Sequence, residues 1–207
     1  MSKQTKMMKV TKAIITAGIL FFLFDTALAI QLTSRQYGSE TIPNVQLQSG
    51  DLAPQAKLLD RHYQQVTIGG SSDKVQIIVT AESLYTPLSN DQITTLNANA
   101  SKLNATVVYV VTANQPIIVN MFENTHKFNT IQFLSAFNNP AFGLSYGVQI
   151  IGGKLTGITV PAIFVVNHQG KIVYKEIAHK LDQKLNIQAA ITAAENVEKN
   201  GGSTVIE

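Results

Sequence analysis

The chain has 207 residues, of which 45% are hydrophobic, so it can form one folded domain with its own core and is not an intrinsically disordered chain. Its formal net charge is +3, from sixteen basic and thirteen acidic residues. It contains no cysteine, which excludes disulfide bonds, a thiolate nucleophile, iron–sulfur clusters and thiolate metal sites.

The first 29 residues have the pattern of a secretory signal peptide. Four lysines precede an apolar stretch over 13–24, and Asp25 is followed by Thr26-Ala27-Leu28-Ala29. A basic start, a short apolar run and an A-x-A site are typical of a leader that is removed after export. We expect cleavage after Ala29 and a periplasmic or secreted protein. An uncleaved leader would be the only membrane attachment, but its apolar run is shorter than the roughly 20 residues that span a bilayer.

The whole net charge of +3 belongs to this leader, which contains four lysines and one aspartate. Removing residues 1–29 leaves twelve basic and twelve acidic residues, a formally neutral protein. Nucleic-acid binding depends on a concentration of basic side chains, which the remaining chain lacks. We therefore expect no nucleic-acid partner.

The remaining chain divides into a leading segment, one domain and a short tail. Residues 30–50 are rich in Gln, Ser, Thr and Gly and predict a linker or a loosely ordered segment. The folded domain is expected over 51–200, and 201–207 form a C-terminal tail.

The first half of the domain predicts a hairpin followed by a strand, a helix and a second strand. Residues 56–59 and 65–68 flank a polar turn and predict a β-hairpin. The β-branched segment 74–80 predicts a strand. Apolar residues three or four apart predict a helix that opens near Ser89, with Ser89 or Asn90 as its N-cap, and the apolar run 105–112 predicts a buried strand.

The middle of the domain predicts short alternating elements. A helix is expected over 116–123, a strand over 130–134 and a second short helix over 140–146.

The last part predicts a closing hairpin and a final helix. Residues 161–166 and 171–175 flank Asn167-His168-Gln169-Gly170, a turn that joins two antiparallel strands. An amphipathic helix is expected over 182–200, ended by two glycines.

This order predicts an α/β sandwich of thioredoxin-like architecture. Central parallel strands with helical crossovers, an N-terminal β-hairpin and a closing antiparallel hairpin form a mixed sheet flanked by helices.

One block of the sequence resembles a known family. Residues 134–142 read LSAFNNPAF, 146–148 read YGV and 153–158 read GKLTGI. In this order and spacing they resemble the bacterial thiol peroxidases, atypical two-cysteine peroxiredoxins of the thioredoxin-like superfamily. The resemblance implies that the α/β sandwich is of peroxiredoxin type. The similarity runs from Val107 to about Ile177 without a gap.

The resemblance implies where the family's chemical groups would lie. The peroxidatic Thr-x-x-Cys motif corresponds to Thr86-Pro87-Leu88-Ser89, so Ser89 stands in place of the reactive cysteine. The resolving cysteine falls on Glu123, and the arginine that polarises the peroxide falls on Pro161. Since a serine oxygen cannot be oxidised as a thiolate is, the family's peroxidase mechanism is excluded and no catalytic residue is expected.

Two alternatives remain, in which the pocket that corresponds to the family's active site supports a different reaction. Ser89 could act as a hydrolase nucleophile, although no partner histidine or oxyanion hole can be identified from the sequence. Glu123 and His126 have a Glu-x-x-His spacing that could contribute half of a metal site. The other histidines, His62, His168 and His179, are expected at the surface.

The sequence therefore predicts an exported, non-catalytic relative of the thiol peroxidases that acts by binding or assembly. We expect no cofactor and no metal. The partner is expected to be another protein or a second copy of the chain, since the related enzymes are commonly dimers. Pro161 opens the 161–166 strand, where thioredoxin folds often have a cis-proline, so a cis Val160–Pro161 bond is a further alternative.

Overall fold

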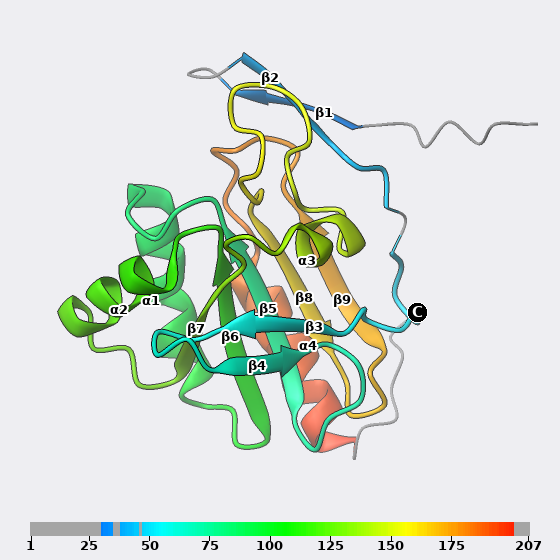
Figure 1. Cartoon of the computed structure of the whole chain (residues 1–207). Coiled ribbons are helices and arrows are strands. Elements are labelled where there is room, and N and C mark those ends of the chain that lie inside the picture. Colours follow the sequence, from blue (N-terminus) through cyan, green and yellow to red (C-terminus); the bar gives the residue numbers. More distant parts are fainter. Residues whose placement is uncertain (1–29, 35–37, 46, 201–207) are drawn as a thin grey trace, which may run out of the picture.

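The computed structural model describes residues 30–34, 38–45 and 47–200, which form a mixed seven-stranded sheet with helices on both faces (Figure 1). The expected leader, its cleavage site and the tail lie outside these residues. None of the helices within the described ranges is long and apolar enough to cross a membrane.

The predicted elements of the domain are confirmed in type and order. The strands of the sheet are β3 (Ala56–Leu59), β4 (Gln65–Ile68), β5 (Val75–Ala81), β6 (Thr106–Thr112), β7 (Ile131–Ser135), β8 (Ala162–Val166) and β9 (Ile172–Ile177). The helices are α1 (Pro87–Ala100), α2 (Pro116–Thr125), α3 (Pro140–Ser145) and α4 (Ile187–Lys199).

The sheet has the strand order β4-β3-β7-β6-β5-β8-β9. Strands β5, β6 and β7 run parallel, and the connections between them pass through α1 and α2. Strand β8 pairs antiparallel with β5, β9 pairs antiparallel with β8, and β3 pairs antiparallel with β7. The carboxyl ends of the three parallel strands therefore meet at one edge of the sheet, where α1 and α2 begin.

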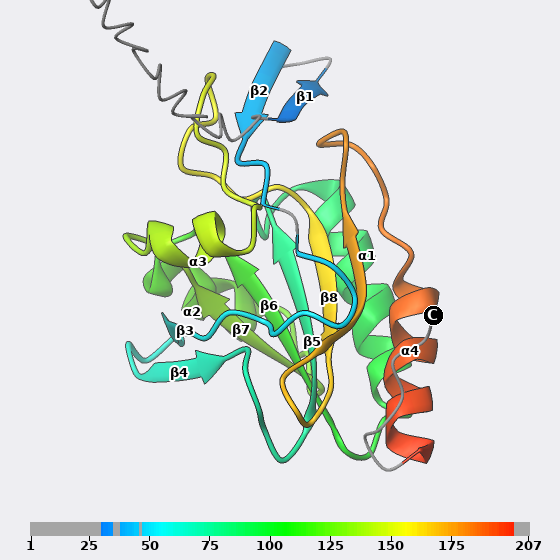
Figure 2. The same cartoon turned by 90° about the vertical axis from the view of Figure 1, so that its right-hand side faces the viewer.

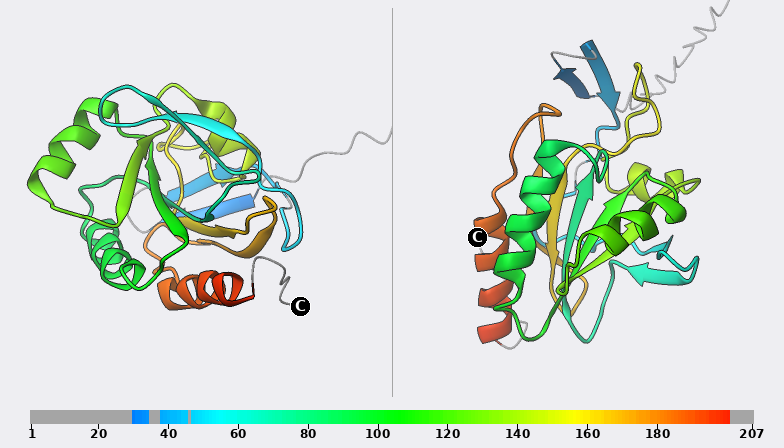
Figure 3. Two further views of the ribbon diagram at one scale, coloured as in Figure 1. Left: turned by 90° about the horizontal axis from the view of Figure 1, so that it is seen from below. Right: turned by 90° about the vertical axis from the view of Figure 1, so that its left-hand side faces the viewer.

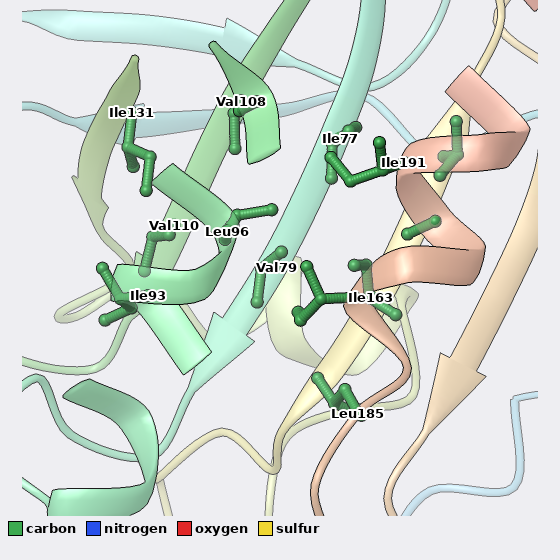
Figure 4. Packing of buried hydrophobic residues seen from close by; sticks show 14 of the residues in the cluster. Ile77, Val79, Ile93, Leu96, Val108, Val110, Ile131, Ile163, Leu185 and Ile191 are labelled. Atoms are coloured by element: carbon green, nitrogen blue, oxygen red, sulfur yellow. The ribbon is translucent and has the colours of Figure 1, made fainter. Parts of the chain in front are cut away.

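Side chains from the two faces of the sheet form two hydrophobic cores. On β5, Ile77 and Val79 pack beneath α1 and α4, whereas Ile78 points to the opposite core with Phe142 of α3. Figures 2 and 3 show α1 and α4 side by side on one face and α3 on the other. Figure 4 shows the first core, in which Leu96 of α1 and Ile191 of α4 meet the sheet. Because side chains alternate between the two faces of a strand, the wholly buried β5 contributes apolar residues to both cores.

Two helices begin at residues other than those predicted. Helix α4 starts at Ile187 and not near residue 182, because the side chain of Asn186 caps it by accepting a hydrogen bond from the N–H of Ala189 (3.0 Å). Helix α1 starts at Pro87, two residues before Ser89, with Thr86 as its N-cap. The signal was present in the sequence, since proline favours the first helical position.

The segment 30–50 differs from the predicted linker. It contains a separate hairpin of β1 (Ile30–Ser34) and β2 (Gly38–Ile42), seen at the top of Figure 1. Leu32 and Ile42 are buried in the second core. Only a few apolar residues anchor this hairpin, which is why the segment shows little hydrophobic periodicity.

The hairpin is fastened to the domain by a buried carboxylate. Glu40 is fully buried, and its two carboxylate oxygens accept hydrogen bonds from the backbone N–H groups of Lys154 and Leu155, both at 3.1 Å. Gly153 has φ +110°, and a Cβ there would lie 2.1 Å from Glu40 Oε2. A glycine is thus required both for the backbone conformation and for the approach of the carboxylate.

We predict that Glu40→Ala lowers the free energy of unfolding by about 2 kcal/mol, because two backbone N–H groups lose the buried carboxylate that accepts their hydrogen bonds. Urea denaturation measures this change. Glu195→Ala is the matched control, since Glu195 makes only a helix-surface pair with Lys199 at 3.9 Å and its loss should cost about 0.5 kcal/mol or less. Equal losses in the two variants would contradict the role given to Glu40.

Candidate functional site

The position expected for the reactive group of the family lies in a cluster of one carboxylate and two hydroxyls, formed by Glu82, Thr86 and Ser89. Thr86 Oγ1 donates to Glu82 Oε1 (2.8 Å) and Ser89 Oγ donates to Glu82 Oε2 (3.2 Å). The two hydroxyl oxygens are 2.9 Å apart. We call these three residues the Glu82 cluster.

The Glu82 cluster is built by the connection from β5 to α1. Thr86 has an extended backbone (φ −78°, ψ 144°), and its hydroxyl accepts a hydrogen bond from the N–H of Ser89 (3.2 Å). The prediction that Ser89 or Asn90 caps the helix is therefore wrong. Ser89 lies inside the first turn, and its N–H is one of the groups that the cap satisfies.

This arrangement leaves Ser89 poorly suited to nucleophilic chemistry. Its side chain is buried, with 4% of the residue exposed. Among the described residues its hydroxyl contacts Glu82 and Thr86, and the structure brings no histidine to it. A serine nucleophile needs a base that takes its proton and a path for the substrate, and the hydroxyl instead serves as a donor to a carboxylate.

Glu82 is the member of the cluster that the sequence analysis missed. It lies directly after β5 and four residues before the N-cap. A carboxylate beside the first turn of a helix is stabilised by the helix dipole and by capping hydroxyls. That spacing, an acid just upstream of Thr-Pro at a helix start, is the signal that could have identified it.

Strand β8 closes the cluster's side of the sheet. The hydroxyl of Thr80 donates to the carbonyl of Val160 (2.5 Å), and the hydroxyl of Thr159 donates to the carbonyl of Ala81 (3.0 Å). Pro161 is buried and follows a trans peptide bond, so a cis Val160–Pro161 bond is ruled out. The next residue, Ala162, is the first of β8 and pairs with Thr80 of β5.

Asn114 joins the carboxyl ends of the three parallel strands. Its side-chain oxygen accepts from the N–H of Leu84 (3.1 Å) and the hydroxyl of Thr112 (2.9 Å). Its backbone carbonyl accepts from the hydroxyl of Ser135 (2.6 Å). These bonds satisfy the buried polar groups at this edge from within the chain.

Glu123 lies in a different place from the Glu82 cluster. It forms an ion pair with Arg61 of the β3–β4 turn, with Nη1 and Oε2 3.1 Å apart. Desolvation by burial raises the pKa of the Glu123 carboxyl, and the positive charge of Arg61 opposes that rise only in part. Glu123 is thus a partly buried partner of Arg61.

His126 lies beside Glu123 in an open hollow of about 480 Å³ between the β3–β4 turn and the end of α2. Its ring stacks on Phe122 with centroids 4.2 Å apart, and Nδ1 is 3.1 Å from the carbonyl oxygen of Phe122. Across the described ranges, no group of three or more His, Cys, Asp or Glu residues is placed to hold a metal ion. Among these residues, the fold therefore brings no third metal ligand to Glu123 and His126.

Of the remaining histidines, His62 lines the same hollow as Glu123 and His126, whereas His168 and His179 line neither this hollow nor the Glu82 cluster. His62 is exposed in the β3–β4 turn and accepts a hydrogen bond from Arg61 Nε (3.0 Å). His168 lies in the β8–β9 turn near the carbonyl of Ser72 (3.3 Å), and His179 is exposed.

The Glu82 cluster gives a testable expectation for a restored thiol. In Ser89→Cys, the full negative charge of Glu82 at hydrogen-bond distance and the burial of the site outweigh the partial positive charge of the helix end. We expect a thiol pKa above the ordinary value of about 8.5. The thiolate absorbance near 240 nm, followed against pH, measures it.

The double variant Glu82→Gln/Ser89→Cys is the matched control. It keeps the shape of the site and removes the charge, so its thiol pKa should be lower than in the single variant. A single variant with a thiol pKa well below 8.5 would show that the Glu82 carboxylate does not govern this position.

Comparisons with known proteins agree on one family. The redoxin family model matches residues 48–191. The chain is 30% identical to a thiol peroxidase of Campylobacter jejuni over 135 residues, which are 65% of this chain and 76% of the relative. It is 27% identical to a thiol peroxidase of Aquifex aeolicus over 151 residues, 73% of this chain and 89% of that one.

Solved structures show the same fold. A peroxiredoxin-like protein from Aquifex aeolicus superposes with a TM-score of 0.76 at 24% identity, covering 81% of this chain and 96% of its own. A thiol peroxidase from Chromobacterium violaceum superposes with a TM-score of 0.72 at 19% identity, covering 84% and 98%. The chain therefore belongs to the redoxin family, as a relative of the bacterial thiol peroxidases that contains no cysteine.

Proposed function

We propose that this chain is an exported, non-catalytic member of its family that acts by binding or assembly. The observation that carries the proposal is the absence of cysteine from all 207 residues. Peroxide reduction by this family's chemistry requires a thiolate that becomes a sulfenic acid, and no other side chain here undergoes that cycle.

The Glu82 cluster supports the same proposal. Ser89, Glu123 and Pro161 remain our assignment of the peroxidatic, resolving and peroxide-polarising positions. A peroxide substrate would meet a carboxylate at the start of α1 that already accepts hydrogen bonds from two hydroxyls of the chain. Such a cluster stabilises the helix start and offers neither a nucleophile nor a cation to a substrate.

Exposed apolar side chains near α2 fit a protein partner or a second copy of the chain. Ile117 and Met121 are one turn apart on α2, and both are exposed. Tyr85, also exposed, packs edge-on against Phe122 of the same helix with ring centroids 5.4 Å apart. Adjacent exposed apolar residues of this kind are typical of interaction surfaces.

We predict that the purified protein consumes no hydrogen peroxide or organic hydroperoxide above a protein-free control when thioredoxin and its reductase supply electrons. Peroxide loss and NADPH oxidation, followed in the same sample, are the measurements. A cysteine-containing thiol peroxidase assayed in parallel shows that the reductant is active. Sustained turnover by this chain would refute the proposal.

The proposed export predicts a processed protein. When the full chain is produced in a Gram-negative bacterium, intact-mass spectrometry of the envelope fraction should find a species that begins at Ile30, because the A-x-A site ends at Ala29. Ala27→Arg is the control, since a large charged residue at this site blocks processing. An unprocessed wild-type chain in the cytoplasm would contradict export.

A further inference from the structure

A second hollow lies at the carboxyl ends of β6 and β7, apart from the Glu82 cluster. It has a volume of about 430 Å³ and lies between the β7–α3 connection, α3 and residues 156–159. In open α/β sheets the crevice outside the carboxyl ends of the strands is where ligands bind. The volume is within the range of small-molecule sites. We call it the α3 hollow.

The lining of the α3 hollow contains no ionisable side chain. Its polar side chains are amides and hydroxyls, contributed by Asn138, Asn139, Gln149, Thr156 and Thr159. The ring of Phe137 supplies an aromatic surface, and 40% of this residue is exposed. A charged ligand would therefore lose hydration on entry without gaining an ionic partner.

Two of the amides have unused hydrogen-bonding capacity. In the part of the chain that the structure describes, the side chains of Asn138 and Gln149 make no hydrogen bond, whereas Asn139 donates to the carbonyl of Lys57 (2.7 Å). Each unused amide offers two donors and one acceptor. A wholly apolar ligand would cover these groups without pairing them, which costs free energy.

The backbone holds these amides at the hollow. Asn138 has a positive φ of +56°, a conformation that is uncommon outside glycine. Gln149 lies against Gly143 of α3, where a Cβ would be 2.6 Å from Gln149 Cβ and 3.0 Å from its Oε1. Gly143 thus makes room for the Gln149 side chain.

A ligand that fits must be neutral, rich in hydroxyl or amide groups, and apolar on one face. A sugar ring has these properties: its axial C–H groups can lie on the face of an aromatic ring while its hydroxyls pair with amides. An extended peptide fits less well, because it needs a free strand edge or a long groove, and the hollow is enclosed by two loops and a helix.

We propose that the α3 hollow binds a neutral sugar unit, with Phe137 as the stacking surface and Asn138 and Gln149 as hydrogen-bonding groups. This inference deepens the binding role proposed above and rests on it. The sugar is either a free saccharide or a unit of a longer glycan, since both present the same chemistry.

The experiment uses the purified protein and ligand-detected saturation-transfer NMR with glucose, N-acetylglucosamine and their β-1,4-linked oligomers. We expect saturation of the ring C–H protons of at least one neutral sugar. Glucosamine, which is cationic at pH 7, should give a weaker signal than N-acetylglucosamine. Tighter binding of the oligomers than of the single units would identify a glycan, and equal binding would identify a free sugar.

Two variants locate the site. Phe137→Ala and Gln149→Leu should each weaken binding by at least roughly tenfold. Tyr85→Ala is the matched control, because it removes another exposed aromatic ring that does not line the α3 hollow, and it should bind as the wild type does. Thermal unfolding of each variant confirms that it is folded.

Two results would overturn the inference: no saturation of any neutral sugar by the folded wild type, or wild-type binding by both Phe137→Ala and Gln149→Leu. Neither result bears on the peroxide assay. Absence of sugar binding together with absence of peroxide turnover would refute the sugar site alone, whereas peroxide turnover would refute the non-catalytic role alone.

Discussion

Burial of β5 on both faces is the constraint on which the rest of the structure depends. All seven residues of this strand are buried, between β6 on one side and β8 on the other. Its side chains alternate between the two hydrophobic cores. Burial of apolar side chains is the main favourable contribution to folding. The end of β5 then fixes where α1 starts, and with it the position of Glu82.

That position shows how a redoxin scaffold can be retained without its chemistry. A helix start needs acceptors for its unpaired N–H groups, and in this fold it also favours an anion. Here Thr86 supplies the acceptor and the carboxylate of Glu82 lies beside it, bound by two hydroxyls. The electrostatic requirement of the helix start is met by the chain itself, so the fold does not depend on a thiolate at this position.

Asn114 and Thr159 likewise form hydrogen bonds within the chain at the carboxyl edge of the sheet. The α3 hollow is the exception at this edge, because Asn138 and Gln149 present amides with no partner in the described chain. Gln149 is half-buried, and a half-buried polar group without a partner is costly, which makes its position informative about function. The Glu82 cluster is hydrogen-bonded within the chain, whereas the amides of Asn138 and Gln149 are available to a ligand in the α3 hollow.

The sequence by itself determined the fold class, the order of the elements within the domain and the exclusion of thiol chemistry, because hydrophobic periodicity and the cysteine count are local properties of the chain. The β1–β2 hairpin could not be predicted from the sequence, since it depends on hydrogen bonds from residues 154 and 155 to Glu40, more than a hundred positions away. The same holds for the Arg61–Glu123 pair. Only the tertiary structure decided these, because each depends on contacts between segments distant in the chain, which no local pattern encodes.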